Sequence, residues 1–118
     1  MNKISIVIPA FNEEQGIGSV IKQVPVSSLN ASGYEVEIIV VDNASTDHTA
    51  DVARSHGAFV VYQPLRGYGN AYKAGFNNAT GDIIVTGDAD MTYPFDMALS
   101  LIEKLETENL DFRAKETI

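Results

Sequence analysis

The chain has 118 residues, of which 45% are hydrophobic and 20% are charged, the size and composition of one globular domain. Its 16 acidic and 8 basic residues give a formal net charge of −8, which argues against nucleic acid as a partner and supplies no polybasic anchor for an anionic membrane. Cysteine is absent, which excludes disulfides, thiol catalysis and thiolate zinc sites and fits a reducing compartment such as the cytoplasm.

The first apolar run of the sequence, residues 4–8, ends at Pro9. It is too short for a secretory signal or a membrane-spanning helix, which needs about twenty apolar residues. No other stretch approaches that length. We therefore expect a soluble chain.

Short runs rich in Val and Ile recur along the sequence and are each closed by turn or polar residues. Continuous apolar runs are typical of strands that are covered on both faces. The predicted strands are 4–8, 36–41, 59–62 and 83–85.

Helical patterns lie between these runs. Capping residues, acidic first turns and apolar spacing predict four helices. The first is capped by Asn12 and closed by Pro25, and the second is capped by Thr46 or Asp47 and ended by Gly57. The third covers residues 68–79, and the fourth is opened by Pro94. Residues 26–33, rich in Ser, Asn and Gly, predict a flexible loop.

The resulting order, βαβαβαβα, predicts an α/β fold with an open, mainly parallel, Rossmann-like sheet and helices on both faces. We assign residues 1–107 to this domain. Residues 108–118 are weakly patterned and predict a tail or the start of a further strand near Leu110. A sheet cut short after its fourth βα unit would leave an edge that can pair with a second copy.

Polar residues follow every predicted strand, in the segments 9–14, 42–47, 64–70 and 87–90. Ligands of open α/β sheets bind outside the carboxyl ends of the strands. Because all of these segments belong to that edge, we expect them to form one site.

Asp88 and Asp90 form the sharpest of these patterns, since they leave an apolar strand two residues apart. Such a pair can face one Mg²⁺ or Mn²⁺ ion together with diphosphate oxygens, and the metal would neutralise a leaving diphosphate. The alternative is that one aspartate caps the next helix and the other is solvated.

Asp42 is the first polar residue after its strand, where its carboxylate could accept a hydrogen bond from the ring N–H of a nucleotide base. The alternative is that it satisfies amides of the following turn. Glu13 belongs to a predicted first helical turn, where the helix dipole favours an acid without any catalytic role.

Arg66, Gly67 and Gly69 join a strand to a helix. The glycines would let backbone amides approach a phosphate, the helix N-terminus adds partial positive charge, and Arg66 can pair with the anion. The alternative is a flexible turn without a ligand.

Taken together, these segments resemble the N-terminal half of a family 2 glycosyltransferase with the GT-A fold, most closely its polyprenyl-phosphate branch, which includes the dolichyl-phosphate sugar synthases. The resemblance runs from about Lys3 to Leu105. It implies a UDP- or GDP-sugar donor on this edge and inversion of the sugar's anomeric centre.

By motif, the resemblance also assigns roles to residues of this chain. Pro9, Phe11 and Glu13 would line the base and ribose pocket, Asp42 would bind the base, and Arg66, Gly67 and Gly69 would lie beside the nucleotide. Asp88 and Asp90 would meet ribose, metal and diphosphate, with Asp90 in direct metal contact.

The sequence departs from the family pattern in two motifs and in length. Asn43 replaces a second Asp, and Met91-Thr92-Tyr93-Pro94 replaces the Leu-Gln-His-Pro of the mannose synthases, which weakens the case for mannose. The acceptor-binding half of the family is absent. We therefore expect donor binding but weak or no transfer to a polyprenyl phosphate, at the cytoplasmic face of a membrane.

Two other function classes compete with this one. Asp88-Ala89-Asp90-Met91-Thr92 also matches the nucleophile motif of haloacid-dehalogenase-type phosphatases, but no later strand supplies that family's acidic pair. The other is a non-catalytic nucleotide-binding module that completes its sheet by dimerising.

Overall fold

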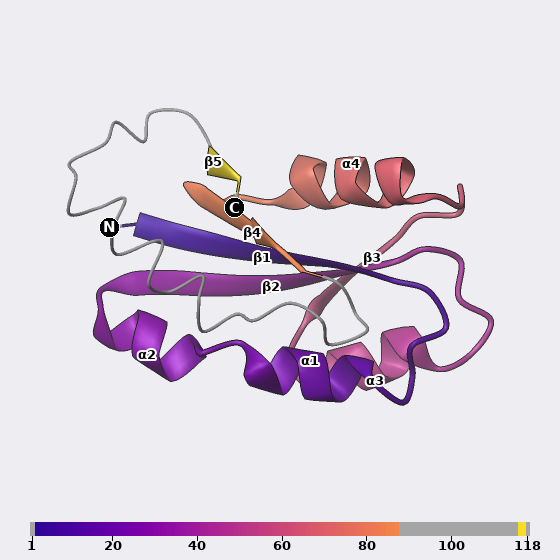
Figure 1. The fold of residues 1–118 in the computed structure, drawn as a ribbon, viewed down its shortest axis with the longest axis horizontal. Helices are drawn as coiled ribbons and strands as arrows, with labels where there is room; N and C mark the ends of the chain where they lie inside the picture. The colour runs from indigo at the N-terminus through magenta and orange to yellow at the C-terminus, as the bar shows by residue number, and fades with distance from the viewer. Residues whose placement is uncertain (1, 88–115, 118) are drawn as a thin grey trace.

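A computed structural model describes residues 2–87 and 116–117. Its strands form one parallel sheet in the order β3-β2-β1-β4-β5 (Figure 1). The strands are β1 (Asn2–Ala10), β2 (Tyr34–Asp42), β3 (Phe59–Tyr62), β4 (Ile83–Thr86) and β5 (Glu116–Thr117). The prediction of an open parallel α/β sheet of the GT-A type is confirmed.

The apolar runs form strands because both faces of the sheet are covered. Alternate residues of β1 enter two cores: Ile4, Ile6 and Ile8 belong to one, and Val7 belongs to the other. All of these side chains are at most 2% exposed. A strand buried on both faces needs apolar residues at every position, which explains the continuous pattern.

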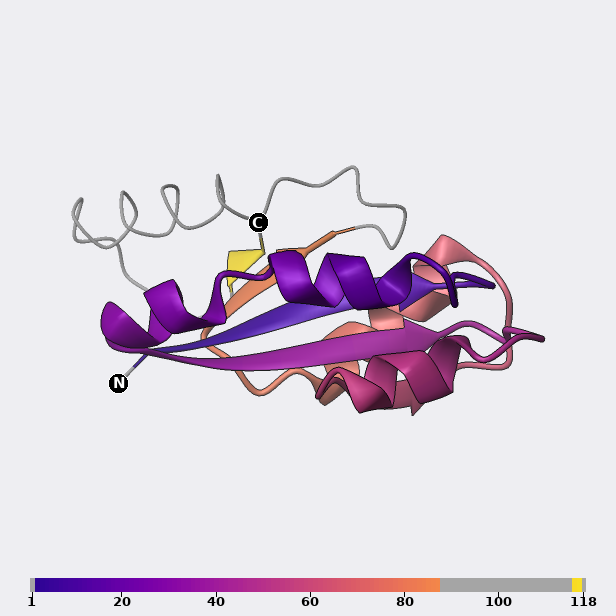
Figure 2. The same cartoon turned by 90° about the horizontal axis from the view of Figure 1, so that it is seen from below.

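Helices cover both faces, as predicted. The core on one face takes side chains from α1 (Ile17–Gln23), α2 (Val26–Ala31) and α3 (Thr49–Ser55), and the core on the other takes them from α4 (Tyr68–Asn78). In Figure 1, α4 lies above the sheet and the other helices lie below it; Figure 2 views the molecule from the side of α1, α2 and α3.

Residues 26–33 are not a loop, and this prediction was wrong. Pro25 stands at the N-cap of α2, where its fixed φ is tolerated and its missing N–H costs nothing. Leu29 then buries its side chain to 2% exposure on the sheet. Burial of this one leucine outweighs the low helix propensity of its Ser and Asn neighbours.

The cap predicted for the first helix was also wrong. α1 begins at Ile17 with Gly16 as its N-cap, whereas Asn12 has a left-handed backbone with φ 51°. At α3 the N-cap residue is His48, but the Asp47 carboxylate accepts the Thr49 amide at 2.9 Å, so Asp47 supplies the expected capping group.

Gly75 lets α4 lie directly on the sheet. A Cβ at this position would overlap Val7 Cγ1 and would lie 3.2 Å from Val41 Cγ2. The close approach of this helix fixes its N-terminus at the carboxyl edge of β2 and β3.

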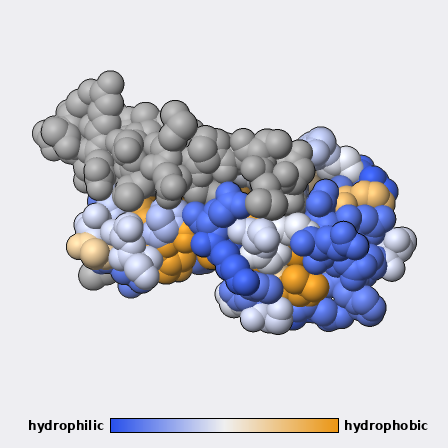
Figure 3. All heavy atoms as spheres, turned by 60° about the horizontal axis from the view of Figure 1, so that its bottom comes forward, coloured by the Kyte–Doolittle hydropathy of each residue, from blue (hydrophilic) through white to orange (hydrophobic). Residues whose placement is uncertain are grey.

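The helix predicted from Pro94 and the strand predicted near Leu110 lie outside the described residues. Within the described residues, no helix has the length and apolar character required to cross a bilayer. The face in Figure 3 is mostly hydrophilic where it is coloured, with apolar residues in separate small areas.

Candidate functional site

The loops that leave β1, β2 and β3 meet at the carboxyl edge of the sheet, at the right-hand end of Figure 1. Gly87, which follows β4, donates its amide to the Val7 carbonyl at 3.2 Å and so lies against β1. The predicted convergence of the polar segments is therefore confirmed for the loops after β1, β2 and β3.

The first two loops are held together by Asn12. Its amide donates to Ser45 Oγ at 2.9 Å, and its Oδ1 accepts the Thr46 amide at 2.8 Å. Ala44, one residue before Ser45, also has a left-handed backbone, with φ 64°. Two non-glycine residues with positive φ in facing loops mark a locally strained arrangement, of a kind that clusters at functional sites.

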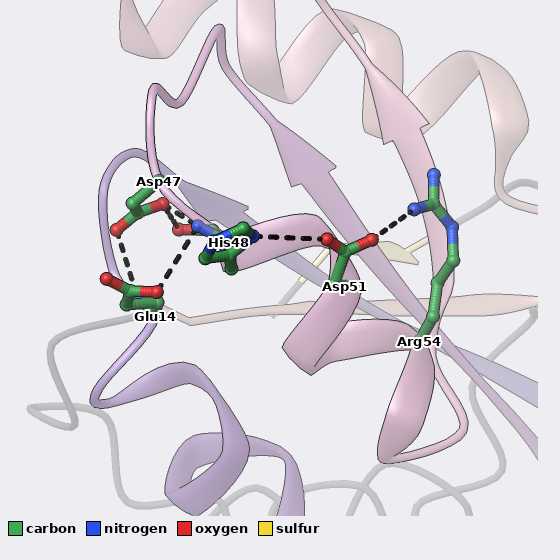
Figure 4. A network of polar contacts seen from close by, with 6 residues as sticks. Glu14, Asp47, His48, Asp51 and Arg54 are labelled. Carbon is green, nitrogen blue, oxygen red and sulfur yellow. Dashed lines mark hydrogen bonds and ion pairs between the residues drawn. The ribbon is translucent and has the colours of Figure 1, made fainter.

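A second set of contacts joins the same loops through Asp47 (Figure 4). Asp47 accepts hydrogen bonds from the Thr49 amide and hydroxyl and from the Glu14 amide. Although burial acts to raise it, the pKa of Asp47 lies below its ordinary value because these donors stabilise the carboxylate. The Thr49 hydroxyl in turn accepts the Glu13 amide at 2.8 Å.

Figure 4 also shows contacts that extend from this network along the exposed face of α3. His48 Nδ1 lies 3.4 Å from Asp51 Oδ2, and Arg54 Nη1 lies 3.5 Å from Asp51 Oδ1. All three side chains are at least 60% exposed, so these pairs contribute little to stability.

Asp42 ends β2 and is 7% exposed. Its Oδ1 accepts the Ser45 amide at 3.0 Å, so the turn-stabilising role considered from the sequence is present. No described residue donates to Oδ2. One oxygen of this buried carboxylate thus shapes the loop, and the other has no donor among the described residues.

Asn43 organises the loop after β3, and the sequence argument missed this. Its Nδ2 donates to the carbonyls of Gln63 at 2.9 Å and Leu65 at 2.8 Å, while its Oδ1 accepts the Gly67 amide at 2.9 Å. The side chain is buried, with 6% exposure of the residue. Asparagine was noted only as a departure from a motif, although a carboxamide is the group that can both donate and accept here.

Arg66 and Phe11 come together from different loops. The Arg66 guanidinium carbon lies 3.4 Å from the centroid of the Phe11 ring, a cation–π arrangement. Phe11 is half-buried and Arg66 is exposed. The contact places a fixed positive charge at the edge where the loops converge.

Gly67 and Gly69 occupy different positions in the start of α4. Gly67 is the N-cap with φ 126°, a conformation that requires glycine, and its amide is already accepted by Asn43. Gly69 lies in the first helical turn, where N–H groups have no intrahelical acceptor. Amides of this turn, rather than that of Gly67, are therefore the ones that could meet an anion.

Pro9 lies near the end of β1, and Glu13 lies in the loop that follows this strand. Pro9 is buried and pairs with Val41 of β2, whereas the last described pairing of β1 with β4 comes earlier, at Val7. The missing N–H of Pro9 therefore interrupts no described pairing with β4. Glu13 is half-buried, and its carbonyl accepts the Ile17 amide at 2.8 Å, so its backbone shapes the start of α1.

Asp88 and Asp90 lie outside the described residues. Among the residues that are described, no group of three or more His, Asp or Glu side chains is arranged to hold a metal ion. The assignment of a metal ion to Asp88 and Asp90, which follow β4 closely in the sequence, stays a prediction.

The parallel sheet with polar loops at its carboxyl edge defines an open α/β protein, a class whose ligands bind outside the carboxyl ends of the strands. Residues 5–113 match the family model described as Glycosyl transferase family 2. The chain belongs to this family, as its motifs indicated. The phosphatase alternative is accordingly set aside.

Two characterised relatives illustrate the range of the family. The chain is 37% identical over 108 residues to a low-salt glycan biosynthesis hexosyltransferase of Haloferax volcanii, covering 92% of this chain and 26% of that protein. It is 36% identical over 113 residues to an undecaprenyl-phosphate 4-deoxy-4-formamido-L-arabinose transferase of an Enterobacter species, covering 90% of this chain and 34% of that one.

Among solved structures, glucosyl-3-phosphoglycerate synthase of Mycobacterium tuberculosis, in complex with Mn²⁺, UDP and glucosyl-3-phosphoglycerate, is similar with a TM-score of 0.63 and 40% identity. The match covers 75% of this chain and 33% of the synthase. The chain thus spans between a quarter and two fifths of the length of these relatives.

Proposed function

We propose that this chain binds a nucleoside diphosphate sugar at the carboxyl edge of its sheet and serves as the donor-binding part of a hexosyltransferase. The observation that carries the proposal is the joining of three loops at this edge around Arg66, the Asp42 carboxylate and the first turn of α4. A cation, a helix N-terminus and a hydrogen-bond acceptor match a diphosphate and a base.

Within this proposal each side chain has a defined part. Pro9, Phe11 and Glu13 line the base and ribose pocket, and Asp42 accepts the ring N–H of the base through Oδ2. Arg66 and the amides near Gly67 and Gly69 face the diphosphate. UDP is supported by the mycobacterial synthase, and a GDP-sugar remains the second donor candidate.

The proposed metal ion is Mn²⁺ or Mg²⁺, held by Asp88 and Asp90. Two carboxylates, phosphate oxygens and water are ligands that suit either ion. Mn²⁺ accompanies UDP in the mycobacterial synthase. When bound, the ion would neutralise charge on the leaving diphosphate.

The proposed acceptor is a polyprenyl phosphate. Its phosphate oxygen would attack the anomeric carbon of the donor sugar with inversion and displace the nucleoside diphosphate, and the undecaprenyl-phosphate transferase supports this acceptor. Such an acceptor would place the protein at the cytoplasmic face of a membrane. We assign residues 1–107 to the donor-binding unit and 108–118 to a tail or a further strand. A phosphate acceptor is already anionic and needs no catalytic base.

A second candidate is a non-catalytic nucleotide-binding module that dimerises through the β3 edge of the sheet. Phe59 and Tyr62 of this edge strand are 61% and 63% exposed, and an edge strand is a template for pairing. Size measurement over a range of concentrations tests this: a strict monomer at high concentration contradicts it.

Calorimetric titration with UDP, GDP and their sugars, with and without Mn²⁺ or Mg²⁺, tests the donor proposal. We expect metal-dependent binding of one diphosphate nucleotide by the wild type and its loss or strong weakening in Asp90→Ala. Asp42→Asn is expected to weaken binding by about tenfold, since the base loses a charged acceptor.

Two results would contradict parts of this proposal. Unchanged affinity in Asp90→Ala removes the metal role of that residue. If Asp42→Asn lowers the melting temperature but leaves affinity unchanged, Asp42 serves the turn alone. Robust sugar transfer to a polyprenyl phosphate by the purified chain would contradict the expectation that the chain by itself has weak or no transferase activity.

A further inference from the structure

We propose that Asn43 is a positioning residue of the donor site: its carboxamide holds the loop after β3 in the shape that sets Arg66 on the Phe11 ring. The inference rests on the proposed nucleotide-binding function for its consequence. Its structural part, the dependence of the Arg66 position on Asn43, can be tested without any nucleotide.

The contacts of Asn43 bracket Arg66 on both sides in the sequence. Nδ2 donates to the Leu65 carbonyl at 2.8 Å, one residue before Arg66, and Oδ1 accepts the Gly67 amide at 2.9 Å, one residue after it. A further bond from Nδ2 to the Gln63 carbonyl, at 2.9 Å, fixes the start of the same loop.

Asn43 is itself anchored to the sheet. Its backbone amide donates to the Ala10 carbonyl at 2.9 Å, at the end of the central strand β1. One residue thus connects the ends of β1 and β2 to the loop after β3. Phe11 follows Ala10 directly in the sequence. Asn43 therefore connects both partners of the cation–π pair, Arg66 and Phe11, to the end of β1.

The rest of the loop offers few alternative constraints on Arg66. The residues from Pro64 to Asn70 are exposed, and Leu65 is 64% exposed. Asn70, in the first turn of α4, donates to the Arg66 carbonyl at 3.2 Å and so links Arg66 to the helix. Among the described side chains, the buried carboxamide of Asn43 is the one that joins this loop to the ends of β1 and β2.

The chemistry of the contact requires an amide and not a carboxylate. Two backbone carbonyls approach Nδ2, and only a donor satisfies them. Aspartate has the same shape but would direct an anionic oxygen at both carbonyls while keeping the acceptor for Gly67. Asn43→Asp consequently removes the hydrogen-bond donor Nδ2 and preserves the side-chain volume. Its effect therefore reports the loss of the positioning hydrogen bonds and not a change in core packing.

The test compares Asn43→Asp and Asn43→Ala with the wild type and with Asn78→Asp. Asn78 is the matched control because its exposed Nδ2 also donates to a backbone carbonyl, that of Ala74 at 2.8 Å, away from the loops. The first readout is the NMR spectrum of the nucleotide-free chain. A guanidinium on an aromatic face has side-chain signals displaced by the ring, and Phe11→Leu identifies these signals for Arg66.

The second readout is the affinity for UDP with Mn²⁺. We expect Asn43→Asp to shift the Arg66 signals toward those of the Phe11→Leu protein and to weaken UDP binding by about tenfold. Asn43→Ala should do the same to a smaller extent, because it adds no repulsion. Asn78→Asp should leave both readouts unchanged.

The outcomes separate the two proposals. Wild-type Arg66 signals in Asn43→Asp overturn the positioning role, whatever the nucleotide does. Displaced Arg66 signals in a chain whose wild type fails to bind UDP support the positioning role and overturn the donor-site proposal. If Asn43→Asp does not fold, Asn43→Ala decides by the same Arg66 signals, and wild-type signals there overturn the inference.

Discussion

The guanidinium carbon of Arg66 lies 3.4 Å above the ring of Phe11, although the two residues come from loops that follow different strands. The pair forms because the loops after β1 and β3 are both tied to the end of β2 through Asn12 and Asn43. The stacked face of Phe11 limits where the cation can point. The Arg66 side chain is thus already ordered, so it would lose little conformational freedom when its charge binds a ligand.

Replacing Arg66 by glutamine is expected to weaken UDP binding by about tenfold to a hundredfold, since a hydrogen bond to a charged group contributes roughly 1.5–3 kcal/mol. Arg66→Lys keeps the charge but loses the planar stack, so we expect an intermediate affinity. Calorimetric titration measures both. Arg54→Gln is the control, because Arg54 is an exposed arginine of α3 that pairs with Asp51 on the same helix. Equal affinities of the two glutamine variants would contradict the assignment.

Replacing Ala44 by glycine is expected to stabilise the protein by up to about 1 kcal/mol. A left-handed backbone costs an L-residue roughly 1–2 kcal/mol, and Ala44 has φ 64°. Glycine relieves that strain but loses more chain entropy on folding. Urea unfolding measures the difference. Ala74→Gly, within α4, is the matched control and should destabilise by roughly 0.5–1 kcal/mol. A loss of stability in Ala44→Gly would show that the loop network, and not glycine-like freedom, sets this conformation.

Much of the fold was predictable because the strands are rich in Val and Ile and the central ones are covered on both faces. The apolar runs at 59–62 and 83–85 fall on β3 and β4 with boundaries that agree to within one residue. Continuous apolar patterning, short loops and the parallel rule leave few other topologies. The chain order of these runs therefore predicted which ends share an edge.

The errors arise where long-range contacts outweigh local propensity. The segment 26–31 has loop-like composition, yet α2 forms because Leu29 has a place in the core. Asn12 has the chemistry of a helix cap, but its Oδ1 is used by Thr46, 34 residues away in the sequence. A sequence window contains neither partner, so local patterns could not supply these assignments.

For the site, residue types at strand ends were predictable and their division of roles was not. The two glycines were expected to let backbone amides approach a phosphate, and the structure shows that the Gly67 amide is bound to Asn43, 24 residues earlier. The available amides therefore shift to the first turn of α4. Asp42 has the turn-stabilising contact that the sequence left open, through its Oδ1 and the Ser45 amide, and its role toward a base stays a prediction.

At the opposite end of the sheet, Glu37 joins the segment before β4 to the central strands. One of its oxygens, Oε2, accepts hydrogen bonds from the Ser5 hydroxyl and from the Thr80 amide at 2.7 Å and hydroxyl at 3.1 Å. The other, Oε1, lies 3.7 Å from Lys3 Nζ. Burial acts to raise the pKa of Glu37, but these donors and the lysine charge together hold it below its ordinary value of 4.5.

Glu37→Gln is expected to lower the free energy of unfolding near neutral pH by roughly 1–3 kcal/mol, because a neutral amide oxygen is a weaker acceptor for the donors on Oε2 and an NH₂ group would replace the oxygen that faces Lys3. A carboxyl whose pKa is depressed in the folded state contributes stability that is fully present above the unfolded value, here 4.5, and is lost as the pH falls through the folded value. The difference in free energy of unfolding between wild type and variant should therefore be largest above about pH 5 and should narrow as the pH falls below 4.5.

Urea unfolding at a series of pH values measures this difference. Glu35→Gln, an exposed neighbour on β2, is the control that leaves the pH profile unchanged. A gap that is constant from pH 7 to about pH 3 would mean that Glu37 acts through its shape and not through its charge.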